Sequence, residues 1–136
     1  MCYGYNRGKG GKKMKILEVK NLTKIYGTGE NEVKALDHVS FSVEKGEFIA
    51  IVGSSGSGKS TLLNILAALD KPTEGKVFLK EKDLSKVKEK EMAAFRRNNL
   101  GFVFQDFNLL DTFSLKDNIF LPLVLSGTSY REMERR

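Results

Sequence analysis

Gly53-Ser54-Ser55-Gly56-Ser57-Gly58-Lys59-Ser60 is the stretch that decides the fold class of this chain. It fits the phosphate-loop pattern G-x-x-x-x-G-K-[ST] at every required position. A flexible Gly/Ser linker would lack the apolar runs on either side, which here are FIAIV at 48–52 and TLLNIL at 61–66. The sequence therefore predicts a nucleoside triphosphate site between a buried strand at 47–52 and a helix at 59–69.

The residue types of this loop suit a polyphosphate ligand. Glycine-rich backbone can turn its N–H groups toward phosphate oxygens, and the N-terminus of the following helix adds the positive end of its dipole. We expect Lys59 to reach the β- and γ-phosphates and the Ser60 hydroxyl to hold Mg²⁺. The predicted phosphate-binding residues are Gly53, Ser54, Ser55, Gly56, Ser57, Gly58, Lys59 and Ser60.

Composition bounds the remaining possibilities. The 136 residues are 40% hydrophobic, which is enough for one ordinary globular domain. The net charge of +6 comes mostly from residues 1–13, and the nearly neutral remainder argues against nucleic acid as the main ligand. Cys2 is the only cysteine, so neither an intrachain disulfide nor a zinc pattern is expected. No apolar stretch approaches the roughly 20 residues that span a bilayer, which predicts a soluble or membrane-peripheral chain.

The order of apolar patterns predicts an α/β fold. Residues 1–13 show no periodicity and are expected to form a disordered leader before a folded region at 14–136. Alternating stretches favour a small antiparallel subdomain, and the continuous apolar runs favour a parallel core sheet with flanking helices. The predicted strands are 15–22, 33–45, 47–52, 76–80 and 100–105, and the predicted helices are 59–69, 89–98, a short one near 115–121, and one beginning at 129.

Three further features surround the phosphate loop. Tyr26 lies at the end of the first predicted strand, Gln105 ends the apolar run LGFVF, and LDKPTEGKV stands between them at 69–77. Together with VEKGEFIAIVGSSGSGKSTLLNIL at 43–66, these strings resemble the nucleotide-binding subunit of ATP-binding-cassette (ABC) transporters. The tract at 101–127 is similar to the exporter branch for lipoproteins, macrolides and antimicrobial peptides, with a leaning toward the bacitracin-type members.

The resemblance covers about residues 14–136 and implies an ABC-type P-loop NTPase that uses ATP and Mg²⁺. By that resemblance Tyr26 stacks on adenine, although a partly buried strand-end tyrosine is the plainer alternative. Gln105 matches the glutamine that ligates Mg²⁺ or orients the attacking water, the alternative being an ordinary polar residue at a strand end. Thr61 joins the phosphate-binding set on the same ground.

The resemblance also implies partners. The family's subunits pair with a second nucleotide-binding subunit, as a homodimer in the full-length parent, and dock on an integral-membrane permease subunit. This places the chain in the cytoplasm, on the inner face of the membrane. Residues 106–125 match the start of the helical subdomain that leans on the membrane subunit, and equally they could be plain core.

The sequence departs from the family pattern by omission. After Gln105 a full cassette carries an LSGGQ signature, a strand ending in Asp-Glu and a switch histidine, and these 136 residues contain none of them. The stretch LSGTS at 125–129 lacks the second glycine and the glutamine, and His38 precedes the phosphate loop, where a structural role is expected. In the family the strand ending in Asp-Glu lies between the strand before the phosphate loop and the strand ending at Gln105, so the parallel core sheet is expected to be incomplete. We therefore expect the N-terminal part of a cassette, in which the hydrolytic set is also incomplete and enzymatic activity uncertain.

Two functions stay open at this stage. The first is the ATP-binding subunit of an exporter for antimicrobial peptides or for lipoprotein- or macrolide-like substrates, here lacking its hydrolytic half. The second is a non-hydrolysing nucleotide-binding or interaction module derived from such a subunit. A P-loop kinase is disfavoured, because Arg96-Arg97 is the only candidate for the arginine cluster of its lid.

Overall fold

The computed structural model describes residues 14–104 and 108–135. The chain divides into two compact units, with the boundary between Ala93 and Ala94. No helix within these residues has both the length and the apolar character needed to cross a bilayer.

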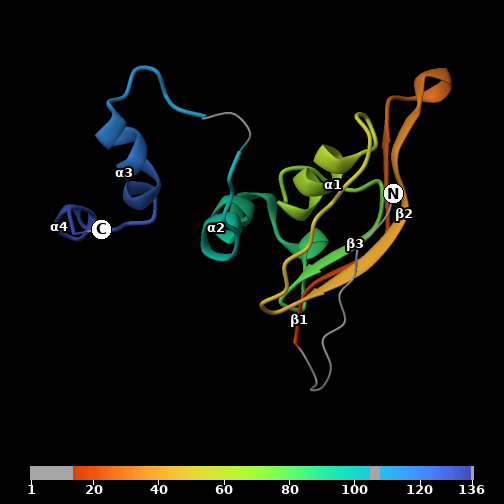
Figure 1. The fold of residues 1–136 in the computed structure, drawn as a ribbon, viewed down its shortest axis with the longest axis horizontal. Helices are drawn as coiled ribbons and strands as arrows, with labels where there is room; N and C mark the ends of the chain where they lie inside the picture. Colours follow the sequence, from red (N-terminus) through yellow and green to blue (C-terminus); the bar gives the residue numbers. More distant parts are fainter. Residues whose placement is uncertain (1–13, 105–107, 136) are drawn as a thin grey trace. The chain divides into compact units, whose positions relative to one another are not determined.

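The first unit is built on a four-stranded antiparallel sheet with the strand order β2-β1-β3-β4 (Figure 1). β1 and β2 form a long hairpin in which Tyr26 pairs with Val33, and β3 lies on the other side of β1. The prediction of an antiparallel subdomain is confirmed. Its elements are β1 (Lys15–Tyr26), the 3-10 turn η1 (Gly29–Asn31), β2 (Val33–Glu44), β3 (Glu74–Leu79), β4 (Lys82–Asp83) and a second 3-10 turn, η2 (Leu84–Lys86).

A bulge allows β1 to bury two residues that are three positions apart. Val19 and Leu22 are both buried, and a regular strand would turn them to opposite faces. Between them Asn21 takes a positive φ of 47°, and its N–H donates to Ser40 Oγ at 2.8 Å. Gly75 meets this bulge, because a Cβ at residue 75 would lie 2.3 Å from the Asn21 carbonyl oxygen. The bulge lets the strand continue past the predicted end at residue 22.

Helix α1 (Lys59–Leu66) packs against β2 in the first unit (Figure 1). Leu62 and Ile65, one helical turn apart, are fully or almost fully buried, as are Val19 and Leu22 of β1. This is the apolar stripe expected of a helix that covers one side of a sheet. The predicted helix start is confirmed, and the regular helix ends at Leu66 rather than at residue 69.

The prediction of two continuous apolar strands is wrong for the described residues. Residues 47–52 form no strand apart from an isolated bridge at Ile51, and residues 100–104 form none. Phe48 and Val103 are almost fully exposed. A parallel strand needs a ladder partner to satisfy its backbone, and neither stretch pairs into a parallel sheet within residues 14–104. The strand ending in Asp-Glu, which follows Gln105 in the family, is not found in these 136 residues.

The second unit is helical. It holds the end of α2 (Glu89–Asn99), then α3 (Leu115–Leu125) and α4 (Tyr130–Met133). The three helices predicted after residue 88 are therefore confirmed. Ser114 caps α3 in a reciprocal capping box with Asp117, which fixes the helix start. The rings of Phe120 and Tyr130 meet edge-on at 6.1 Å between centroids, and this contact joins α3 to α4.

Candidate nucleotide-binding site

The predicted phosphate loop, residues 53–60, runs directly into α1. Gly56 and Gly58 have φ values of 76° and 82°, a left-handed conformation that glycine adopts without strain. Gly58 also lies against β2, since a Cβ there would sit 2.3 Å from the Ala35 carbonyl oxygen. The loop closes on itself through the Ser57 N–H, which donates to the Ser54 carbonyl at 3.3 Å. Local backbone chemistry and close packing on β2 therefore both require glycine at position 58.

The Lys59 side chain folds back over this loop. Its Nζ donates to the carbonyl oxygens of Gly53 at 3.0 Å and Ser54 at 2.6 Å, and it lies 3.4 Å from Ser57 Oγ. These acceptors are carbonyl and hydroxyl oxygens, which carry no formal charge to offset that of the ammonium. A phosphate oxygen is a stronger acceptor for an ammonium than a carbonyl, because both partners are then charged.

The first turn of α1 presents backbone donors beside that ammonium. Its N-cap is Gly58, which supplies no side-chain acceptor, and the first bond within the helix runs from Leu62 N to Gly58 O at 2.9 Å. The N–H groups of Lys59, Ser60 and Thr61 therefore have no acceptor inside the helix. Helix-terminal donors next to a lysine suit a polyphosphate, and the exposed Ser60 hydroxyl suits a Mg²⁺ ion that also binds phosphate oxygens.

Residues 14–104 and 108–135 hold no cluster of the usual metal-ligating side chains. No group of three or more His, Cys, Asp or Glu side chains there could hold a metal ion. Gln105, the second predicted Mg²⁺ ligand, lies outside the described residues. Its role stays a prediction.

Tyr26, the predicted adenine-stacking residue, lies at the end of β1 with 41% of its surface exposed. Its hydroxyl donates to Asp70 Oδ2 at 3.0 Å, and the Lys24 ammonium lies 4.8 Å from the centroid of its ring. Within residues 14–104 no hydrogen bond or ring contact joins Tyr26 to the phosphate loop. The contact between Lys24 and Asp70 could not be predicted from the sequence, because 46 residues separate them and no short motif connects the two.

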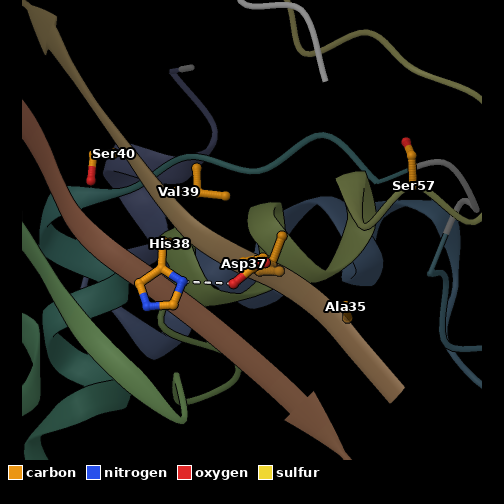
Figure 2. A pocket seen from close by; sticks show the side chains of 7 residues that line it. Ala35, Asp37, His38, Val39, Ser40 and Ser57 are labelled. Carbon is orange, nitrogen blue, oxygen red and sulfur yellow. Dashed lines mark hydrogen bonds and ion pairs between the residues drawn. The ribbon is translucent and has the colours of Figure 1, made fainter.

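A cavity of about 460 Å³ adjoins the loop at Ser57 (Figure 2). Its other side belongs to β2, where His38 Nδ1 lies 2.6 Å from Asp37 Oδ1. The hydrogen bond from His38, and a weaker one from Lys34, lower the pKa of the Asp37 carboxyl. The backbone N–H of His38 donates to the buried Thr23 hydroxyl at 3.2 Å, a contact within the sheet that does not involve the imidazole. The structural role expected for the His38 side chain stays a prediction. The cavity is lined by Ala35, Leu36, Asp37, His38, Val39, Ser40 and Ser57.

Comparison with known proteins identifies the family. Residues 36–136, which include the phosphate loop and everything after it, match the ABC transporter family. The chain belongs to that family. Its resemblance to ABC nucleotide-binding subunits, drawn above from the motifs, is thereby confirmed.

Three ABC transporter proteins are similar to this chain over most of its length. The chain is 50% identical to the uncharacterized ABC transporter ATP-binding protein YvcR of Bacillus subtilis, over 90% of this chain and 48% of that protein. It is 49% identical to the bacitracin export ATP-binding protein BceA of Halalkalibacterium halodurans, over 83% of this chain and 45% of the relative. The macrolide export ATP-binding/permease protein MacB of Hyphomonas neptunium is 45% identical over 89% of this chain and 19% of its own length. The chain thus spans about half the length, or less, of these relatives.

Solved structures confirm the fold class. The ATP-binding cassette MJ0796, solved as a dimer in a post-hydrolysis state bound to ADP and Pi, superposes with a TM-score of 0.80 at 41% identity. The match covers 88% of this ABC chain and 53% of the solved one. The P-loop NTPase fold of the cassette type is therefore established for this chain.

Proposed function

We propose that this chain binds Mg²⁺-ATP through residues 53–61, as the nucleotide-binding part of an ABC transporter. The observation that carries the proposal is the arrangement at the start of α1. The Lys59 ammonium lies over a glycine-rich loop, beside helix N–H groups that lack an acceptor inside the helix. Cationic and backbone donors of this kind favour a polyphosphate over a single carboxylate or a neutral ligand.

Each part of the site has a separate task in this proposal. Lys59 and the amides of the first helical turn would bind the β- and γ-phosphates, and the Ser60 hydroxyl would hold Mg²⁺. Bound Mg²⁺ would neutralise phosphate charge and fix the geometry of the phosphate chain. Tyr26 stacks on adenine, and Gln105 assists at the metal or the attacking water.

The wider role that we propose is export. The relatives named for bacitracin export and macrolide export, at 49% and 45% identity, support a substrate among antimicrobial peptides or among macrolide- or lipoprotein-like compounds. In this role the chain docks on an integral-membrane permease at the inner face of the membrane and pairs with a second nucleotide-binding subunit. The dimeric cassette MJ0796 supports such pairing.

A second candidate function is nucleotide binding without hydrolysis. The 136 residues contain no LSGGQ-type signature and no apolar strand ending in Asp-Glu, and their single histidine, His38, lies in β2. Phosphoryl transfer depends on positioning and on charge stabilisation, so these residues by themselves should bind ATP and turn it over slowly or not at all.

Calorimetric titration with Mg²⁺-ATP, together with a phosphate-release assay, tests both statements. We expect saturable binding that Lys59→Ala weakens by about tenfold or more, because a charge-assisted hydrogen bond to phosphate is lost. Lys45→Ala removes an exposed lysine from the turn before the loop and should leave the affinity unchanged. Equal affinities for the wild-type chain and Lys59→Ala would contradict the phosphate site. Phosphate release that Lys59→Ala abolishes would contradict the non-hydrolysing candidate.

A further inference from the structure

Lys24 and Asp70 form a side-chain cluster with Tyr26 in the first unit, outside the phosphate loop. We propose that Lys24 and Asp70 are positioning residues that hold the Tyr26 ring ready for stacking on the nucleobase. The inference rests on the proposed ATP function and assigns a task to two residues to which the resemblance gives no role.

Lys24 makes three contacts with one ammonium group. Its Nζ donates to Asp70 Oδ1 at 2.8 Å and to the Lys71 carbonyl at 2.7 Å, and it lies 4.8 Å from the centroid of the Tyr26 ring. Only 13% of the Lys24 side chain is exposed. A lysine held this way differs from a solvated surface lysine, because burial strengthens both the ion pair and the cation–π contact.

Asp70 uses both of its carboxylate oxygens in the same cluster. Oδ1 accepts from Lys24 and from the Lys71 N–H at 2.7 Å, and Oδ2 accepts from the Tyr26 hydroxyl at 3.0 Å. Partial burial alone would raise the pKa of this carboxyl, but the hydrogen bonds from Lys24, Lys71 and Tyr26 together lower it. Asp70 is therefore a carboxylate at neutral pH and accepts every one of these bonds.

These contacts fix the tyrosine ring at two places. The hydroxyl is held by Asp70, and the Lys24 ammonium lies over one face of the ring. A base would stack on the opposite face of the ring. Tyr26 as a whole residue is 41% exposed. A ring that is already oriented loses less conformational freedom when the base binds, so the affinity for the base rises.

The cluster also links Tyr26 to the segment that follows α1, the helix that begins at the phosphate loop. Asp70 follows α1 closely, and the segment after it is hydrogen-bonded to the end of β1. The Thr73 N–H donates to the Thr23 carbonyl at 2.9 Å, and the Ile25 N–H donates to Thr73 Oγ1 at 3.0 Å. The base-stacking ring is therefore anchored to the chain that leaves the phosphate-binding helix.

The test compares two ligands on the full chain, Mg²⁺-ATP and Mg²⁺-tripolyphosphate, by calorimetry. The ratio of their dissociation constants reports what the base adds, and base–aromatic stacking predicts a ratio on the order of tenfold in favour of ATP. We expect Lys24→Met and Asp70→Asn each to reduce this ratio about threefold or more while the tripolyphosphate affinity stays within about twofold. Tyr26→Phe, which keeps the ring and loses the Asp70 bond, should reduce it less than Tyr26→Ala. Lys24→Arg should restore most of the ratio.

Lys15→Met is the matched control, because it removes another β1 lysine that pairs with a carboxylate, Glu18, at 2.9 Å. It should change neither affinity. If Tyr26→Ala abolishes the ratio while Lys24→Met and Asp70→Asn leave it intact, the positioning inference is overturned and the ATP site stands. A loss of both affinities in equal measure assigns Lys24 and Asp70 a purely structural role and also overturns the inference. If the wild-type chain binds neither ligand, the proposed function itself fails.

Discussion

Two constraints favour glycine at position 58, the left-handed backbone and the close approach of β2, and Gly46 is subject to the first of them alone. Gly58 and Gly46 share the same positive φ of 82°, but only Gly58 has a neighbour at the place of a Cβ, the Ala35 carbonyl oxygen at 2.3 Å. Gly58→Ala should therefore destabilise the chain by roughly 1–3 kcal/mol and also lower the affinity for tripolyphosphate, since the loop must move away from β2. Urea unfolding and calorimetry measure the two effects.

Gly46→Ala is the control for that substitution. It carries the cost of the left-handed backbone alone, about 1–2 kcal/mol, and lies outside the loop, so the tripolyphosphate affinity should not change. If Gly46→Ala and Gly58→Ala were equal in both measurements, packing against β2 would have no role in shaping the loop.

At the scale of residues, the sequence predicts a site well when the residues that form it are adjacent in the chain. The loop residues from Gly53 to Ser60 form one motif, so their placement ahead of α1 follows from eight adjacent letters. The Lys24–Asp70 pair depends on two segments that meet only after the sheet has formed, and neither residue type signals the other.

At the scale of elements, the acidic end of β4 sets a pH dependence. Asp83 is buried at the N-cap of η2, where its carboxylate accepts from the Ser85 hydroxyl at 2.7 Å and the Ser85 N–H at 2.9 Å. Burial alone would raise the pKa of this carboxyl, but the bonds from Ser85 and the charges of Lys76 and Lys86 lower it. Its folded pKa therefore lies below the unfolded value of roughly 3.9. The stability it contributes is present above that pH and is lost as the pH falls through the folded pKa.

The variant Asp83→Asn isolates this contribution. It keeps an oxygen for the Ser85 N–H and removes the charge, so at pH 7 we expect a loss on the order of 1 kcal/mol. Thermal unfolding followed from pH 7 to pH 2 should show the wild type and the variant converging below about pH 4. Glu30→Gln, at an exposed carboxylate in η1 of the same unit, should run parallel to the wild type throughout. A constant gap between the wild type and Asp83→Asn at every pH would mean that the charge is not involved.

Elements were predictable from sequence where their partner is local. β1 and β2 form a hairpin, so each strand's pattern and the short connection between them were enough. The start of α1 follows from the phosphate-loop motif, and the start of α3 is marked by its capping box. Residues 47–52 and 100–104 have the apolar composition of buried strands, but a parallel strand forms only beside partners that are distant in sequence. Their composition predicted that both stretches are buried. It could not predict that neither pairs with a parallel strand in the described residues.

For the molecule as a whole, these two stretches create an association risk. Phe48 is 93% exposed and Val103 is fully exposed, and each stands within an apolar segment with other exposed residues, Val52 in one and Phe104 in the other. Apolar segments of high strand propensity that are accessible in this way pair readily between molecules. The 136-residue chain should therefore self-associate as its concentration rises.

Phe48→Lys and Val103→Lys should each reduce that association, because a charge in an exposed apolar segment disfavours pairing between chains. Light scattering against protein concentration measures the effect, and the thermal midpoint should change by no more than the small amounts typical of surface substitutions. Thr28→Lys adds the same charge at an exposed polar position and should leave the scattering as in the wild type. If Thr28→Lys suppressed association as strongly as the other two, net charge rather than these segments would govern it. If neither Phe48→Lys nor Val103→Lys had an effect, the association would have to use another surface.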